Sequence, residues 1–119
     1  MSLTVAQIKA DYRRLMNERG ETVAVRRYTG AGTNRPKFDV DVMAVVIGFA
    51  PKDLVGTILQ GDRKAIILAE DLIDAQMALP VTTSDKLVVR GKELQIIAAD
   101  DSTRRVAGVL IAYELQVRG

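Results

Sequence analysis

Two residue types that carry much of enzyme chemistry are missing from this chain of 119 residues, because it contains no cysteine and no histidine. The lack of cysteine excludes disulfide bonds and thiolate chemistry. The lack of histidine removes the commonest general base and the commonest transition-metal ligand. Zinc sites that depend on these residues, Ser-His-Asp triads and Cys-His dyads are therefore all excluded.

Aromatic residues, excess charge and long apolar runs are also scarce. Aromatics make up 4% of the chain, tryptophan is absent, and the net charge is only +2. The core must therefore be built from Val, Ile, Leu and Ala, and the charge alone is too weak to argue for nucleic-acid binding. No apolar run approaches the ~20 residues of a membrane span, and the first residues lack a signal-peptide pattern. We expect a soluble, intracellular protein with no membrane partner.

The length and composition fit one domain spanning residues 1–119, with 48% hydrophobic residues available for a core. Thr4 and Gln7 have the spacing of a capping box, and Ile8, Tyr12 and Leu15 then recur at helical spacing. This pattern predicts an amphipathic helix over 5–19. Its apolar stripe is narrow, so we expect the helix to cover the rest of the fold rather than form its centre.

The remainder, 21–118, alternates between apolar and polar residues in the manner of strands. The clearest alternation is at the C-terminal end, with apolar residues at Val109, Ile111, Tyr113, Leu115 and Val117. Only Glu70–Ala78 is ambiguous, and it has room for one helical turn. One helix followed by about six strands argues against a parallel α/β sheet. The predicted fold is mainly β, an antiparallel β-barrel or β-sandwich with one N-terminal α-helix.

Two irregular segments interrupt the strands, at 30–36 and at 48–60. The first begins Gly30-Ala31-Gly32, like the start of a phosphate-binding loop, but it lacks the third glycine and no helix pattern follows. A hairpin loop is the better interpretation. Between the two segments, 42–49 is apolar on both faces toward its end, which indicates either a central strand or a surface covered by another subunit.

Polar clusters give little support for catalysis. Asp39 and Asp41 would share one face of a strand and could bind a hard cation, but no third carboxylate accompanies them, and a solvated face is the simpler interpretation. Asp100 begins an Asp-Asp-Ser sequence typical of a turn. We therefore expect no catalytic residues, no metal and no cofactor.

Three pairs of adjacent arginines stand out. On a strand, the two members of a pair point to opposite faces, so a pair does not make one contiguous basic patch. We interpret them as subunit contacts or solvated side chains rather than as base-reading groups. The pairs are Arg13-Arg14, Arg26-Arg27 and Arg104-Arg105.

The order of short motifs after residue 40 resembles that of the small head-closure proteins (stopper or head–tail joining proteins) of tailed bacteriophages and prophages. The resemblance covers roughly 40–118, although the position after Gly91-Lys92-Glu93, often aromatic in that family, is Leu94 here. The matching features are the Gly61-Asp62 turn, Pro80, the passage Asp85-Lys86-Leu87 to Gly91-Lys92-Glu93-Leu94-Gln95-Ile96, and the final Tyr113-Glu114-Leu115-Gln116-Val117-Arg118.

The resemblance implies a homo-oligomeric ring at the virion neck, stacked below the portal and joining it to the tail. A lone subunit could be monomeric, and assembly would occur in the host bacterial cytoplasm. The partners would be portal-side and tail-side proteins, with non-specific contact to packaged DNA. In some such proteins a loop between strands closes the channel. The first candidate for that loop is Pro51, Lys52, Asp53 and Gly56, and the second is Gly30, Gly32, Asn34 and Arg35.

Three alternatives stay open. One is a tail-completion or tail-terminator ring protein. Another is a small β-barrel nucleic-acid-binding module, although Tyr12, Tyr28 and Tyr113 are too scattered to form a stacking platform. The third is a carboxylate-only metalloenzyme that uses Asp39 and Asp41.

Overall fold

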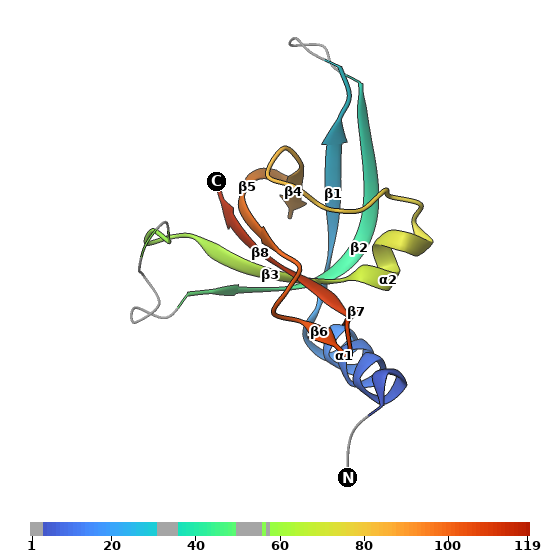
Figure 1. Ribbon diagram of the computed structural model, residues 1–119. Helices are drawn as coiled ribbons and strands as arrows, with labels where there is room; N and C mark the ends of the chain where they lie inside the picture. Colours follow the sequence, from blue (N-terminus) through green and yellow to red (C-terminus); the bar gives the residue numbers. More distant parts are fainter. Residues whose placement is uncertain (1–3, 31–35, 50–55, 57) are drawn as a thin grey trace.

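The structure is a computed structural model that describes residues 4–30, 36–49, 56 and 58–119. Strands dominate it, with one long helix at the N-terminal end and one short helix in the middle (Figure 1). The elements are α1 (Val5–Arg19), β1 (Glu21–Tyr28), β2 (Lys37–Gly48), β3 (Arg63–Leu68), α2 (Ala69–Asp74), β4 (Lys86–Val89), β5 (Lys92–Asp100), β6 (Arg105–Val106), β7 (Val109–Leu110) and β8 (Ala112–Arg118).

Six strands form a closed barrel in the order β1-β2-β3-β8-β5-β4, and every neighbouring pair is antiparallel. The barrel closes where Val23–Arg26 of β1 pair with Lys86–Val89 of β4. The predicted mainly β, antiparallel fold with an N-terminal helix is therefore confirmed, and of the two architectures left open it is the barrel. Closure removes the free edges that a sandwich of the same strands would leave.

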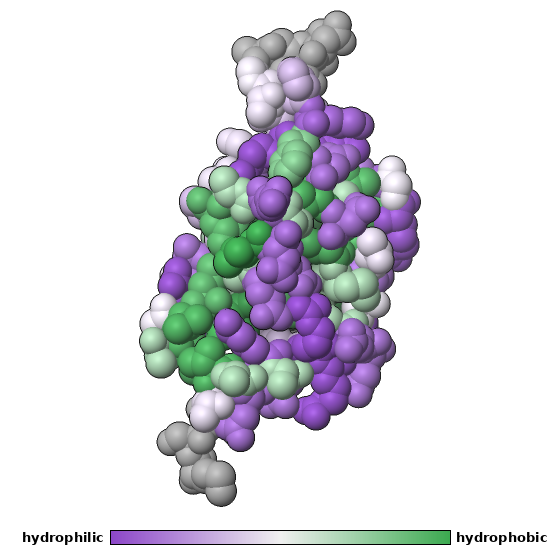
Figure 2. Space-filling view, turned by 90° about the vertical axis from the view of Figure 1, so that its right-hand side faces the viewer, coloured by the Kyte–Doolittle hydropathy of each residue, from purple (hydrophilic) through white to green (hydrophobic). Residues whose placement is uncertain are grey.

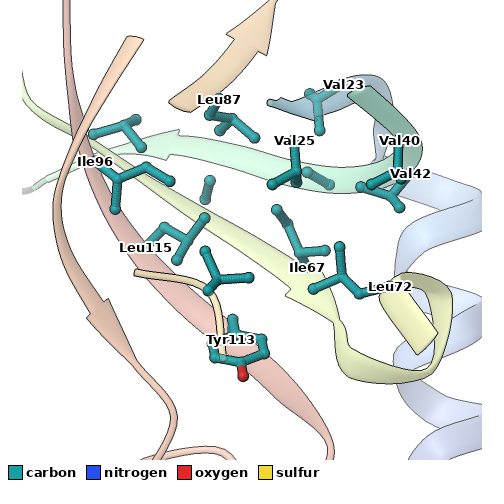
Figure 3. Packing of buried hydrophobic residues seen from close by; sticks show 14 of the residues in the cluster. Val23, Val25, Val40, Val42, Ile67, Leu72, Leu87, Ile96, Tyr113 and Leu115 are labelled. Atoms are coloured by element: carbon teal, nitrogen blue, oxygen red, sulfur yellow. The ribbon is translucent and has the colours of Figure 1, made fainter. Parts of the chain in front are cut away.

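The barrel interior is filled by small and medium apolar side chains, as the scarcity of aromatics predicts. Alternate residues of every barrel strand point inward, and Figure 3 shows Val25, Ile67, Leu87 and Leu115 converging from four different strands. Tyr113 is the one large aromatic side chain in this cluster and is 2% exposed. At about 1.5–3 kcal/mol for each fully buried side chain, this cluster is the main source of stability.

A second apolar cluster lies on the outside of the barrel, beneath α1. Met16 of the helix is fully buried there against outward-facing residues of three strands. The strand residues are Val45, Ile66, Leu68 and Ala112. The helix begins at the predicted capping box, in which Gln7 N donates to Thr4 Oγ1 at 3.1 Å and Thr4 N donates to Gln7 Oε1 at 2.8 Å. The apolar outer face of β2 is thus covered here by the chain's own helix.

The predicted continuous strand over 109–118 is wrong in its first part. Ala107 and Gly108 both have positive φ and form the turn of a small β6–β7 hairpin, which leaves Val109 40% exposed. Ile111 then interrupts the strand, because its N–H donates to Arg104 O and its carbonyl accepts from Ala69 N. Only Tyr113, Leu115 and Val117 of the five alternating residues belong to the barrel core. The ambiguous segment after β3 contains α2.

Candidate functional site

The β1–β2 hairpin extends beyond the barrel wall. Pairing between β1 and β2 continues to Tyr28 and Lys37, whereas β4 accompanies β1 only as far as Arg26. Figure 1 shows this pair of strands rising well above the other strands. Gly30, from the second candidate loop, lies exposed at its end with φ of +74°, and the antiparallel pairing of β1 with β2 agrees with the expected hairpin. Gly32, Asn34 and Arg35 lie outside the described residues.

The other end of β2 pairs with β3 from Ala44–Ile67 to Gly48–Arg63, and Ile47 near the end of this pairing is 46% exposed. This pair stays within the barrel wall, because β8 accompanies β3 over its whole length, from Leu68–Ala112 to Arg63–Val117. The β1–β2 hairpin and the β2–β3 pair share the long strand β2, whose two ends lie far apart in Figure 1. Of the first candidate loop, Gly56 is exposed with φ of +60°. Pro51, Lys52 and Asp53 lie outside the described residues.

Ionic contacts fix the root of the β1–β2 hairpin. Arg26 makes a bidentate contact to Asp39 across the hairpin, with nitrogen–oxygen distances of 2.9 and 3.1 Å. The same guanidinium donates to Glu93 of β5 at 3.0 Å, and the Tyr28 hydroxyl donates to Glu93 at 2.6 Å. The Arg26 contact lowers the pKa of Asp39, and the Tyr28 and Arg26 contacts lower the pKa of Glu93. The hairpin therefore has a defined direction relative to the barrel.

A buried carboxylate, Asp62, fastens the turn before β3 to strand β8. Asp62 is 4% exposed and accepts hydrogen bonds from Leu59 N, Gln116 Nε2 and the Arg118 guanidinium at 2.8–2.9 Å. The Arg118 contact is the largest cause of an Asp62 pKa well below its usual range. The sequence indicated only a Gly-Asp turn here. Nothing local in the sequence marks Asp62 as buried, because the side chains that bind it, those of Gln116 and Arg118, lie on β8.

The paired arginines all make contacts within the subunit, although several keep an exposed side chain, as Arg14 does at 68%. Arg13 of α1 contacts Glu70 at 2.7 Å and Asp71 at 2.6 Å, and so ties the long helix to α2. Arg104 donates to the Tyr12 hydroxyl at 2.7 Å and to Glu114 at 3.2 Å. The remaining intrachain contacts are Arg14 with Asp11, Arg26 with Asp39, Arg27 with Asp85, and Arg105 with the Asp101 and Gly108 carbonyls.

Arg27 also holds the segment that leads from α2 to β4. Its guanidinium binds both oxygens of Asp85 at 2.9 Å and donates to the carbonyls of Ala78 and Pro80. The Asp85 side chain is 2% exposed, and it accepts a further hydrogen bond from Thr82 N at 3.0 Å. One arginine on β1 therefore organises a segment that has little regular structure of its own.

The carboxylates do not converge on a metal site. Among the described residues, no group of three or more Asp or Glu side chains is placed to hold a metal ion. Asp39 is engaged by Arg26, and Asp41 lies exposed on the same strand face. Asp100 forms the predicted turn, accepting from Ser102 N at 2.8 Å and Thr103 N at 3.0 Å. These contacts lower the pKa of Asp100, with the Thr103 hydroxyl as the largest cause.

One end of the barrel opens into a pocket of about 290 Å³ that the sequence did not reveal. It is lined by three apolar residues that are each less than 10% exposed, Val89, Leu94 and Val117, together with cations. The cations are Arg63, Arg90 and Lys92. An apolar floor with a basic rim suits an apolar side chain flanked by acidic groups.

No helix in the described part of the chain is long and apolar enough to cross a membrane.

Comparison with models of protein families and with curated proteins finds no match for this chain. Its function must therefore be argued from the described geometry and from the motif order noted above.

Proposed function

We propose that this chain is a structural head-closure connector of a tailed phage or prophage. Copies of it would form a ring below the portal and join the portal to the tail at the virion neck. The observation that carries the proposal is that each candidate loop connects neighbouring strands of a closed barrel, and that β1 and β2 extend beyond β4 toward one of these loops (Figure 1). A ring protein that plugs a channel needs such loops on a rigid body.

The distribution of charge supports a scaffold rather than an enzyme. The arginines that we singled out in the sequence are paired within the subunit, and the buried carboxylates Asp62 and Asp85 are held by Arg118 and Arg27. Such pairs fix the relative positions of elements, as a rigid scaffold requires. The geometry also disfavours a nucleic-acid stacking surface, because Tyr113 is buried and Tyr12 and Tyr28 are hydrogen-bonded to charged side chains.

In the proposed assembly, one of the two loops lines the channel. Lys52 repeated around a ring axis would create a positive annulus that holds DNA phosphates in a salt-dependent manner. The alternative is that Arg35 supplies this annulus from the β1–β2 hairpin. Each loop has a cation and a neighbouring polar residue, so the two can be tested with matched double substitutions.

The test uses a phage that encodes this chain, in which filled heads are assayed for nuclease-protected DNA. Substituting Lys52→Ala with Asp53→Ala should release DNA if the β2–β3 loop is the plug, whereas Asn34→Ala with Arg35→Ala should then have no effect. The opposite result assigns the plug to the β1–β2 hairpin. Virions that lack density for the chain at the neck would overturn the proposal. Co-purification with the tail-tube protein but not with the portal would favour the tail-terminator alternative.

A further inference from the structure

The basic pocket at the barrel end presents cationic side chains that could bind an acidic partner. Its apolar wall consists of the ends of β4, β5 and β8, and Arg90, which stands on its rim, has a 62% exposed side chain. Arg90 pairs with Glu21 at 3.2 Å, and Lys92 donates to a carbonyl of Gly119 at 3.2 Å. Arg63 is exposed and makes no ion pair within the described residues. A ligand with an apolar tip and carboxylates beside it would match this surface.

Helix α2 presents such a tip. Ile73 is 59% exposed, the largest exposure among the large hydrophobic residues that the structure describes, and Asp74 beside it is exposed as well. A shallow hollow next to the helix is lined by Asp41, Asp71 and Asp74 and contains Arg13 as its single cation. Figure 2 looks at the side of the molecule on which α2 lies and shows apolar areas crossed by polar side chains.

The two surfaces lie at opposite ends of one strand. Arg63 begins β3 at the pocket, and α2 follows directly after Leu68 at the other end of β3. Six residues of strand span roughly 20 Å. In Figure 1, α2 and the chain's C-terminal residue, which lines the pocket, lie on opposite sides of the barrel. Two complementary surfaces at opposite ends of a subunit generate a head-to-tail contact, which forms a ring if the rotation closes.

We infer that α2 of one copy docks on the basic pocket of the next copy, with Ile73 inserted against Val89, Leu94 and Val117. Asp74 and Asp41 then face Arg63, Arg90 and Lys92 of the neighbour, so that opposite charges surround an apolar centre. The occupant is therefore a second copy of this chain. This inference rests on the proposed function, because it names the contact that joins neighbouring subunits of the ring.

The absence of cysteine makes the contact directly testable. One preparation carries Ile73→Cys and the other carries Arg90→Cys, and the two are mixed with a short bifunctional maleimide at increasing protein concentration. Cross-linked heterodimer should form at least several-fold faster than in the control mixture of Phe38→Cys with Arg90→Cys. Phe38 is a matched control because it is also an exposed large hydrophobic residue, at 44%, but lies on the β1–β2 hairpin.

Charge reversal separates a specific contact from random collision. Adding Arg63→Glu to the Arg90→Cys chain should reduce the cross-linking rate to that of the control, and adding Asp74→Arg to the Ile73→Cys chain should restore it. Raising the salt concentration should slow the original pair. Cross-linking no faster than the control at any concentration would overturn the inference. If the chain is nevertheless found at the virion neck, the proposed function stands and only this contact is wrong.

Discussion

Arg118 donates from Nε to Asp62 Oδ1 at 2.8 Å and from a terminal nitrogen to Oδ2 at 2.8 Å, and so fastens the end of β8 to the turn before β3. The Asp62 side chain is 1% exposed while that of Arg118 is 36% exposed. The carboxylate is therefore the member of the pair that cannot turn to water when its partner is lost.

Replacing Asp62 by alanine should destabilise the protein by about 2–4 kcal/mol, because it removes a buried carboxylate that accepts hydrogen bonds from Leu59 N, Gln116 Nε2 and the Arg118 guanidinium. Urea unfolding measures the loss. Asp101→Ala is the control, since Asp101 pairs with Arg105 at only 3.8 Å on the surface, and it should cost less than about 1 kcal/mol. Equal losses in the two variants would show that the Asp62 network contributes no more than a surface ion pair.

Stability should respond to acid in a defined direction. Arg118 holds the pKa of Asp62 below its usual range, so the stability from this pair is complete above about pH 4, where the unfolded carboxyl ionises. It is lost progressively as the pH falls toward the lower folded pKa. Because there is no histidine, stability should be nearly flat from about pH 5.5 to 8. The Asp62→Asn variant should lose less stability on acidification, as measured by the urea midpoint from pH 7 to pH 2.

Removal of the Met16 side chain should loosen the contact between α1 and the barrel. Met16 is 0% exposed and packs on the outer faces of β2, β3 and β8, so Met16→Ala should cost about 2–4 kcal/mol. Asn17→Ala, at an exposed position of the same helix, should leave the unfolding midpoint nearly unchanged. A Met16→Ala protein as stable as the parent would mean that the helix does not depend on this cluster.

Arg27 and Asp85 should behave as one unit. Arg27→Ala and Asp85→Ala should each cost about 2–4 kcal/mol, because each leaves a charged partner inside a nearly buried site. The double variant should cost clearly less than the sum of the two, which a double-mutant cycle measures. In hydrogen exchange, the Thr82 amide should lose protection in either single variant, since it donates to Asp85. Strict additivity would contradict a coupled pair.

The local parts of the fold were predictable from sequence, and the long-range parts were not. Helix α1 has the predicted bounds because its start is encoded by Thr4 and Gln7, only three residues apart. The choice of barrel over sandwich depends on pairing between β1 and β4, whose paired residues are 60 to 66 positions apart. No pattern within one strand specifies that partner.

The same distinction applies to the candidate site. Gly30 and Gly56 were identified from composition, and both lie exposed with positive φ. The basic pocket could not be predicted, because Arg63 at the start of β3 meets Arg90 and Lys92 of the β4–β5 turn only when the barrel forms. The intrachain partners of the arginine pairs could not be predicted for a related reason: the carboxylates are mostly distant in sequence, as with Arg13 and Asp71.

Strand β8 lies between β3 and β5, although it is the last strand of the chain. A nascent polypeptide can therefore not complete the cylinder until Arg118 has left the ribosome. A product stalled before β8 would carry two unsatisfied strand edges, on β3 and on β5, and would be prone to aggregate or to be degraded. In the proposed ring of identical copies, this arrangement would let only subunits that have completed β8 reach the conformation that can be incorporated.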